Sequence, residues 1–271
     1  MTQLDQEYDR VLQKILLEGV DDGDRTGTGT RKITGEQVRF DVSAENFPII
    51  TKKRIVWNSL WTELIWFIQG RTNVEFLHEH DVHIWDQWAR NDGEVGPIYS
   101  KQWRDWNGTD QLQKAVDGLR NNPSSRRHLV SAWNVDDIPK MRLPPCHFSF
   151  QFVSKPQKNS SDIRKLDVVV SQRSCDAPVG GVFNWTSYAT LLLLIAKLTD
   201  HDPGEVIWNG GDVHIYKNQM EAVQKYLSLE KSYEAPRLKI DDIGSLDDIG
   251  HSTVELVDYE CGPFIKFPVA V

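Results

Sequence analysis

Hydrophobic residues recur at intervals of three and four in three segments of the chain, residues 2–19, 58–69 and 184–198. This spacing gathers apolar side chains on one face of a helix. We therefore predict an amphipathic helix over residues 2–19 and a second helix over residues 184–198. Tryptophans cluster around residues 58–69, so we predict that the helix there is buried.

Residues 147–152 instead follow the period of two that is typical of a β-strand. His147, Ser149 and Gln151 alternate there with three phenylalanines, which predicts a strand over residues 146–153. We also predict strands over residues 31–42, 129–134 and 166–174.

Polar stretches separate these segments. Residues 21–30 are rich in glycine and predict a loop, and residues 155–165 predict the polar tip of a hairpin. Residues 86–110 hold three tryptophans among Asp, Asn and Gly, which predicts irregular structure with an aromatic surface.

The order of these elements favours an α+β fold, because helices and strands do not alternate in a regular βαβ rhythm. The length of 271 residues allows one large domain or two small ones. No internal repeat and no linker rich in Pro, Ser or Gly divides the sequence. We therefore expect a single domain over residues 1–271.

Composition narrows the class of protein. The chain has 31 Lys and Arg against 39 Asp and Glu, a net charge of −8, which disfavours a dedicated nucleic-acid binder. The longest strongly apolar run, residues 191–196, is too short to span a bilayer. The first ten residues have no basic head and no apolar signal core, so we do not expect secretion. Three cysteines without metal-type spacing indicate reduced thiols and a cytoplasmic location.

Cys146 is the first candidate for chemistry, because two prolines stiffen the approach to it and His147 follows it. A thiol becomes a nucleophile when a positive neighbourhood favours the thiolate. The alternative interpretation is a small buried hydrophobic residue, which is the commoner role of a cysteine.

Arginines are the second signal, since a planar guanidinium binds phosphate with two hydrogen bonds. Arg25 lies in the Gly/Thr loop, Arg126 and Arg127 follow a Pro-Ser-Ser turn, and Arg173 precedes Ser174. For any one of these arginines, a solvated surface position is the alternative.

Three further groups are weaker candidates. His214 and Tyr216 would share one face of a strand, suited either to sugar hydroxyls or to packing. Glu63 lies in the apolar helix, where a carboxylate is costly unless it is paired or functional. Glu79, His80 and His83 cluster in sequence, but we find no metal-ligand geometry there and expect a solvated loop and no metal.

Taken together, the sequence resembles the thymidylate synthase family over almost its whole length. The blocks that carry the resemblance occur in the family's order. They are DRTGTGT at 24–30, ELIWF at 63–67, IWDQW at 84–88, GPIY at 96–99, SRR at 125–127, SAWN at 131–134, PPCH at 144–147, QRSCD at 172–176, FN at 183–184, GGDVHIY at 210–216 and PVAV at 268–271.

The resemblance implies a homodimer with an α+β fold and a large β-sheet at the subunit interface. It implies dUMP as substrate, methylenetetrahydrofolate as cosubstrate and dTMP as product, with a C-terminal flap formed by residues 268–271. The implied catalytic residues are Cys146 as nucleophile, Glu63, Tyr99, Asp176 and Asn184. The implied nucleotide-binding residues are Arg25, Arg173, Ser174, His214 and Tyr216, with Asn184 at the pyrimidine edge and Arg126 and Arg127 supplied by the partner chain. The implied folate-binding residues are Trp85, Asp176, Val179, Gly180, Phe183 and Ala270.

Asn184 favours dUMP over dCMP, because relatives that hydroxymethylate dCMP have Asp at that position and an amide suits the uracil edge. Three departures from the family pattern keep a dUMP hydroxymethylase open as an alternative: Gly180-Gly181-Val182 lacks the usual proline, Ser149 replaces a bulky residue, and Ser100 replaces glycine. In that enzyme, water would capture the methylene that hydride otherwise reduces. A non-catalytic regulatory homologue is the remaining alternative, and the complete catalytic set disfavours it.

Overall fold

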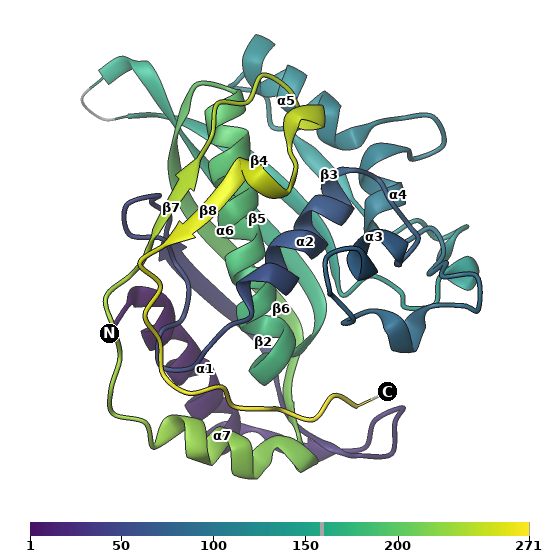
Figure 1. The fold of residues 1–271 in the computed structure, drawn as a ribbon, viewed down its shortest axis with the longest axis vertical. Coiled ribbons are helices and arrows are strands. Elements are labelled where there is room, and N and C mark those ends of the chain that lie inside the picture. Colours follow the sequence, from purple (N-terminus) through teal and green to yellow (C-terminus); the bar gives the residue numbers. More distant parts are fainter. Residues whose placement is uncertain (158–159, 271) are drawn as a thin grey trace.

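The fold is built on a mixed six-stranded β-sheet (Figure 1). The computed structural model describes residues 1–157 and 160–270, and the side chains of residues 160–162 lie outside that description. The strand order is β1-β2-β6-β5-β4-β3, in which β5 and β6 run parallel and the other neighbours run antiparallel. The strands are β1 (Val20–Asp22), β2 (Thr30–Asp41), β3 (Leu129–Ser131), β4 (His147–Gln157), β5 (Ser160–Asp176) and β6 (His201–Tyr216).

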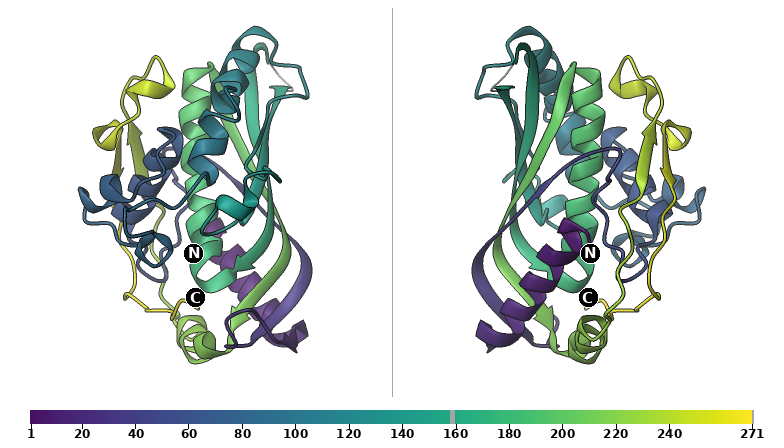
Figure 2. Two further views of the ribbon diagram at one scale, coloured as in Figure 1. Left: turned by 90° about the vertical axis from the view of Figure 1, so that its right-hand side faces the viewer. Right: turned by 90° about the vertical axis from the view of Figure 1, so that its left-hand side faces the viewer.

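Helices cover one face of this sheet in layers (Figure 2). The long apolar helix α6 lies directly on the sheet, and α2 and the small β7–β8 sheet lie on its far side. The opposite face of the sheet carries no helix within the described part of the chain. The elements are α1 (Gln3–Glu18), α2 (Trp57–Ile68), α3 (Glu75–His78), α4 (Tyr99–Arg104), α5 (Gln111–Asn121), α6 (Val182–Leu198), α7 (Met220–Leu227), β7 (Arg237–Ile240) and β8 (Val254–Val257).

The strand register brings four chain segments to one end of the sheet. β4 and β2 begin there, whereas β5 and β6 end there. His147 pairs with Gln172, Asp176 pairs with His214, and Thr30 pairs with Tyr216. Residues from positions about 30, 147, 175 and 215 therefore become neighbours, although they are far apart in sequence.

The predicted α+β class and the three predicted helices are confirmed, at Gln3–Glu18, Trp57–Ile68 and Val182–Leu198. The four predicted strands are present as well, with different lengths. The loop predicted over residues 21–30 begins later, because β1 extends to Asp22. The hairpin tip predicted over residues 155–165 is mostly strand, because β4 and β5 continue to pair beyond the sheet core. Residues 158–159 of that tip lie outside the described residues.

The irregular aromatic surface predicted over residues 86–110 is wrong in one important respect. The segment includes helix α4, and Trp103 on it is 2% exposed. Trp103 packs edge-on against Phe67, at 5.5 Å between ring centroids, and against Phe150 at 5.0 Å. Polar sequence neighbours conceal this burial, because the partners of Trp103 come from α2 and β4.

The alternation predicted in β4 also breaks at its first residues. A register shift between His147 and Ser149 inserts an extra residue into β4. His147 therefore lies on the same side as Phe150, and both contact Tyr188 of α6. Ser149, which precedes Phe150 in the regular part of the strand, points to the opposite face of the sheet.

The segment Ala177–Leu198 is long and apolar enough to cross a membrane by length and composition alone, which we did not expect from the sequence. However, 72% of its most apolar window is buried inside the protein. This burial is the environment of a core helix, and the packing of α6 between the sheet and α2 accounts for its hydrophobicity.

Candidate active site

Cys146 lies immediately before β4 and is held by its backbone. Its N–H donates to the hydroxyl of Tyr99 at 2.6 Å, and its carbonyl accepts from the N–H of Arg173 at 2.8 Å. The Arg173 guanidinium donates to the carbonyls of Pro144 and Pro145, each at 2.9 Å. The two prolines and Arg173 together fix the position of the half-buried thiol.

Within a single chain, fewer positively charged groups lie near this thiol than the sequence suggested. Burial raises the pKa of Cys146, and Arg173 opposes this increase. Arg126 and Arg127 are exposed and precede β3. The first residue of β3, Leu129, pairs with Gln151. Gln151 lies about 17 Å along β4 from Cys146, at about 3.3 Å per residue. The structure therefore does not bring these two arginines to the thiol of their own chain.

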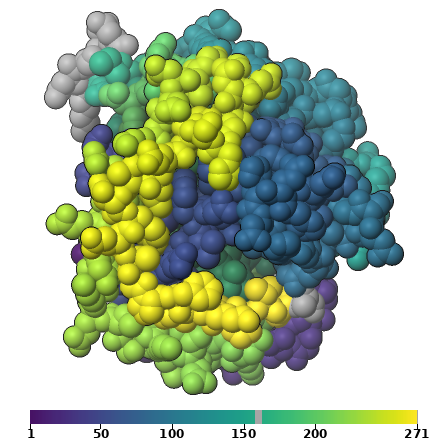
Figure 3. Space-filling model, viewed as in Figure 1, coloured from purple at the N-terminus to yellow at the C-terminus, as the bar shows by residue number. Residues whose placement is uncertain are grey.

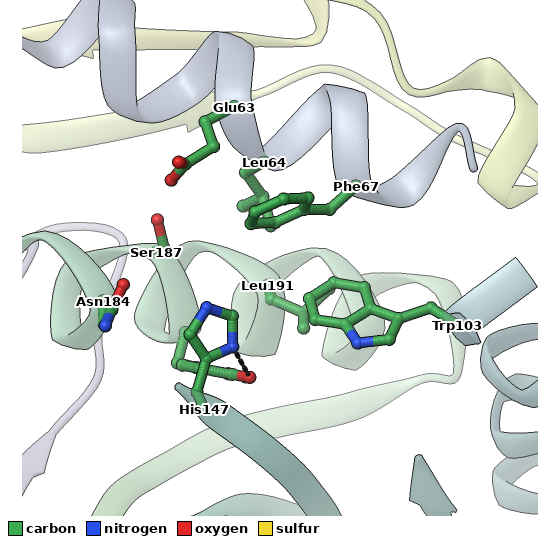
Figure 4. Close-up of a pocket in the computed structure, with 9 residues that line it drawn as sticks. Glu63, Leu64, Phe67, Trp103, His147, Asn184, Ser187 and Leu191 are labelled. Carbon is green, nitrogen blue, oxygen red and sulfur yellow. Dashed lines mark hydrogen bonds between the residues drawn. The ribbon is translucent and has the colours of Figure 1, made fainter. Parts of the chain in front are cut away.

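Glu63 projects from α2 into a pocket between α2 and α6 (Figure 4). The indole N–H of Trp85 donates to its Oε1 at 2.6 Å. Burial raises the pKa of Glu63 to about 7, and the hydrogen bond from Trp85 opposes that effect. Glu63 is therefore suited to accept and release a proton at neutral pH.

Ser187 and Asn184 of α6 face the same pocket, and Figure 4 shows Ser187 and Glu63 pointing toward one another. The buried Ser187 hydroxyl has no hydrogen-bond partner among the described residues. An unsatisfied hydroxyl beside a carboxyl group provides a place for a water molecule or a substrate atom.

His147 forms the floor of this pocket. Its Nδ1 shares a hydrogen bond with the hydroxyl of Tyr188 at 2.8 Å, and its ring stacks on Tyr99 at 4.1 Å. Burial lowers the pKa of His147 to about 3. The imidazole is therefore neutral at physiological pH and contributes no positive charge to Cys146, its neighbour in sequence.

The orientation of the Asn184 amide is fixed by a hydrogen-bond network. Trp208 Nε1 is only a donor, and it donates to Gln172 Oε1 at 2.9 Å. The same oxygen accepts from Asn184 Nδ2 at 3.1 Å. The carbonyl oxygen of Asn184 and its other N–H have no hydrogen-bond partner among the described residues and are available to a ligand.

Asp176, at the end of β5, is the second buried carboxyl group of the site. Burial raises its pKa to about 6, and the hydrogen bond from Gln219 Nε2 at 2.9 Å opposes this increase. Its Oδ1 is buried and has no hydrogen-bond partner in the described part of the chain. This acceptor is therefore available to a donor on a bound molecule.

Gln219 also ties the C-terminal tail to the site, because its Nε2 donates to the carbonyl of Pro268 at 2.9 Å. Phe267 of the tail lies 5.1 Å from the Nζ of Lys53, whose pKa burial lowers to about 8. In Figure 3 the tail crosses the lower face in yellow, and the surface is hollowed between it and the blue segment. The segment expected to form a flap, residues 268–271, thus lies at the edge of this hollow. Its last residue, Val271, is outside the described residues.

His214 and Tyr216 lie side by side at the end of β6, with 5.0 Å between ring centroids. His214 Nδ1 is 2.7 Å from Asp212 Oδ1. Arg25 is exposed on the neighbouring loop, where Asp24 accepts from the backbone N–H of Gly29 at 2.6 Å. The shared strand face predicted for His214 and Tyr216 agrees with this placement.

Several residues of the site escaped sequence reasoning, namely Lys53, Gln172, Ser187 and Gln219. The sequence did contain an indication for Gln172. It is a polar residue on the buried face of β5, where the preceding residues of that face, Val168 and Val170, are valines. The histidine cluster has other members than the sequence indicated, since His83 meets His78 and Asp86, and all three side chains are exposed, as expected for a solvated loop. Glu79 and His80 lie outside that group.

Comparisons with known proteins agree with this geometry. A family model described as thymidylate synthase matches residues 6–271. A thymidylate synthase from Corynebacterium aurimucosum is 42% identical to the chain over 275 aligned residues, which cover 100% of this chain and 99% of that protein.

The elevated pKa of Glu63 can be tested directly. In protein with ¹³C-labelled Glu carboxyl groups, we expect the signal that disappears in Glu63→Gln to titrate near pH 7, because burial penalises the carboxylate. Trp85→Phe removes the donor to that carboxylate and should raise the pKa further. Trp88→Phe changes an indole that packs on Trp85 and is the matched control. Titration of Glu63 in the range of an exposed carboxyl group would contradict this account.

Proposed function

The chain belongs to the thymidylate synthase family, and we propose on that basis that it converts dUMP and methylenetetrahydrofolate into dTMP and dihydrofolate. The observation that carries the proposal is the convergence of three groups at one end of the sheet. Cys146 provides a thiol, Glu63 a carboxyl group that titrates near neutrality, and Asn184 an oriented amide. A non-catalytic homologue would have no need for this combination.

The nucleotide would be held by its phosphate and its ribose. Arg25, Arg173 and Ser174 lie at the same sheet end and would bind the 5′-phosphate, because guanidinium groups match its geometry. His214 and Tyr216, side by side on β6, would hold the ribose hydroxyl.

The Cys146 thiolate would add to C6 of the pyrimidine and form a C–S bond, which moves electron density to C5 and O4. The free N–H of Asn184 would stabilise the negative charge on O4, and its carbonyl oxygen would accept the N3–H. Glu63, with a water held beside Ser187, would exchange protons with O4. Tyr99 would hold the peptide of Cys146 in place and receive support from the His147 ring.

The folate cosubstrate supplies the one-carbon unit and the hydride that reduces it. The residues present fit a pterin, because the unpaired Oδ1 of Asp176 is a buried acceptor and Trp85 is an aromatic wall 5% exposed. Val179, Gly180 and Phe183 are half-buried around Asp176 and Asn184, and Ala270 lies on the tail. We assign these four residues to the folate pocket. We expect no metal in the reaction.

Hydride capture is favoured over the hydroxymethylase alternative by the positions of the three departures. Ser149 points to the face of the sheet opposite Phe150. Ser100 is fully buried and does not line the pocket of Glu63 and Asn184. Val182, which stands at the position of the usual proline, is 1% exposed and does not line that pocket either. None of the three departures therefore adds a polar group to this pocket that could hold a capturing water.

The same proposal includes the assembly. One catalytic domain over residues 1–271 is supported by a family match that runs through residues 6–271. A homodimer across the helix-free face of the sheet would bring Arg126 and Arg127 of the partner chain to the phosphate. Those arginines would also favour the thiolate, which burial disfavours in one chain. A cytoplasmic location fits such an enzyme.

The reaction is tested by following dihydrofolate absorbance while the nucleotide is identified by mass. Starting from dUMP and methylenetetrahydrofolate, we expect dTMP and dihydrofolate in equal amounts. Cys146→Ser should abolish turnover, because an alcohol has almost no anion at neutral pH. Hydroxymethyl-dUMP without dihydrofolate would overturn the synthase proposal in favour of the alternative.

Base choice provides a second test. Asn184→Asp should shift the ratio of turnover from dUMP toward dCMP, because a carboxylate accepts from the cytosine amine but cannot donate to O4. Asn91→Asp places the same change on an exposed loop and should leave the ratio unchanged. An unchanged ratio in Asn184→Asp would show that Asn184 does not contact the base edge.

Shared sites provide a third test. Arg126→Glu and Cys146→Ala homodimers should each be inactive. Equal mixing should give hybrids with one intact site each, and so about a quarter of wild-type activity if the chains combine at random. Hybrid formation is verified with differently tagged chains. Verified hybrids without activity would contradict a partner-supplied Arg126.

A further inference from the structure

Three exposed side chains that the proposed reaction does not use meet where the chain runs from α3 into the short 3-10 helix η1 (Asp86–Trp88), at the right of Figure 1. They are His78, His83 and Asp86. One ligand atom from each lies within 4.8 Å of the other two. His78 Nε2 is 2.7 Å from Asp86 Oδ1, and His83 Nδ1 is 2.9 Å from Asp86 Oδ2.

Buried neighbours hold these three side chains in place. Each one directly follows a residue of the core: His78 follows Leu77, His83 follows Val82, and Asp86 follows Trp85, and these anchors are at most 5% exposed. The backbone is tied as well, since Val82 N–H donates to the Leu77 carbonyl at 2.9 Å. The exposed groups therefore converge because of how the segment is packed, and not because flexible side chains meet by chance.

We propose that His78, His83 and Asp86 form a site for a divalent transition-metal ion of the zinc type. Two imidazole nitrogens and one carboxylate oxygen suit Zn²⁺ or Ni²⁺, whereas Mg²⁺ and Ca²⁺ prefer oxygen ligands alone. The ion replaces the two hydrogen bonds that Asp86 now makes and binds His78 through Nε2 and His83 through Nδ1. This site is separate from the pocket of Cys146 and does not depend on the proposed reaction.

The surroundings complete the coordination chemistry. The other nitrogen of His83, Nε2, lies 3.6 Å from the carboxylate of Asp81, which can orient the ring as outer-sphere carboxylates do. A surface depression of about 470 Å³ opens beside His78 and Asp86, so water can fill the remaining coordination positions. A bound ion would link the end of α3 to the start of η1, which directly follows Trp85 in sequence.

The test is calorimetric titration of the full-length protein with ZnCl₂ at pH 7.5. We expect one Zn²⁺ per chain with micromolar affinity, and no binding heat with MgCl₂ under the same conditions. His83→Ala should weaken Zn²⁺ binding by at least about tenfold, as loss of metal-site residues does. His83 is exposed, so this variant should keep its thermal midpoint without metal.

His80→Ala is the matched control, because His80 lies on the same segment but stacks on His251, 4.4 Å away. It should bind Zn²⁺ as the wild-type protein does. Absence of Zn²⁺ binding to the wild-type protein would overturn the proposal and leave only His–Asp hydrogen bonds. Equal binding by His83→Ala and the wild-type protein, or equal loss in both histidine variants, would also overturn it, since the ion would then be bound elsewhere.

Discussion

The candidate active site depends on the position of β5, which pairs antiparallel with β4 and parallel with β6. The backbone N–H of Arg173 reaches the carbonyl of Cys146, and Asp176 lies opposite His214. A register slip of one residue would turn every side chain of β5 to the other face. It would remove Gln172 from Asn184 and Asp176 from Gln219 at the same time. The thiol, the amide and the buried carboxyl groups therefore form one assembly rather than independent contributions.

Burial then determines the protonation states of that assembly. The same low-dielectric interior raises the pKa of Glu63 to about 7 and that of Asp176 to about 6, and lowers that of His147 to about 3. Glu63 is thus partly protonated at neutral pH, Asp176 is mostly ionised there, and His147 carries no charge. Because His147 is neutral, positive charge for the Cys146 thiolate must come from arginines. In one chain Arg173 supplies it, and burial still prevails. The shortage of positive charge near this thiol in a single chain is the physical reason for proposing that a second chain contributes arginines to the site.

Sequence patterns predicted much of this structure where the determinants are local. The spacing of apolar residues located α1, α2 and α6 to within two residues. Local sequence context singled out Cys146 and Glu63, and motif resemblance led to Asn184. Features fixed by distant partners were missed. Trp103 is buried by α2 and β4, the register shift after His147 depends on β5, and Gln219 matters through contacts with Asp176 and Pro268. His83 was grouped with its sequence neighbours, whereas a turn of the chain places it against His78 and Asp86.

The central claim is that this edge of the sheet makes Cys146 a covalent nucleophile toward dUMP. Intact-protein mass spectrometry of enzyme quenched during turnover tests it most directly, with peptide mapping of the modified residue. The account predicts one nucleotide per modified chain, attached at Cys146, and the same adduct in Cys261→Ala, which changes a half-buried thiol outside the site. An active enzyme without an adduct, or an adduct mapped to Cys175 or Cys261, would contradict it.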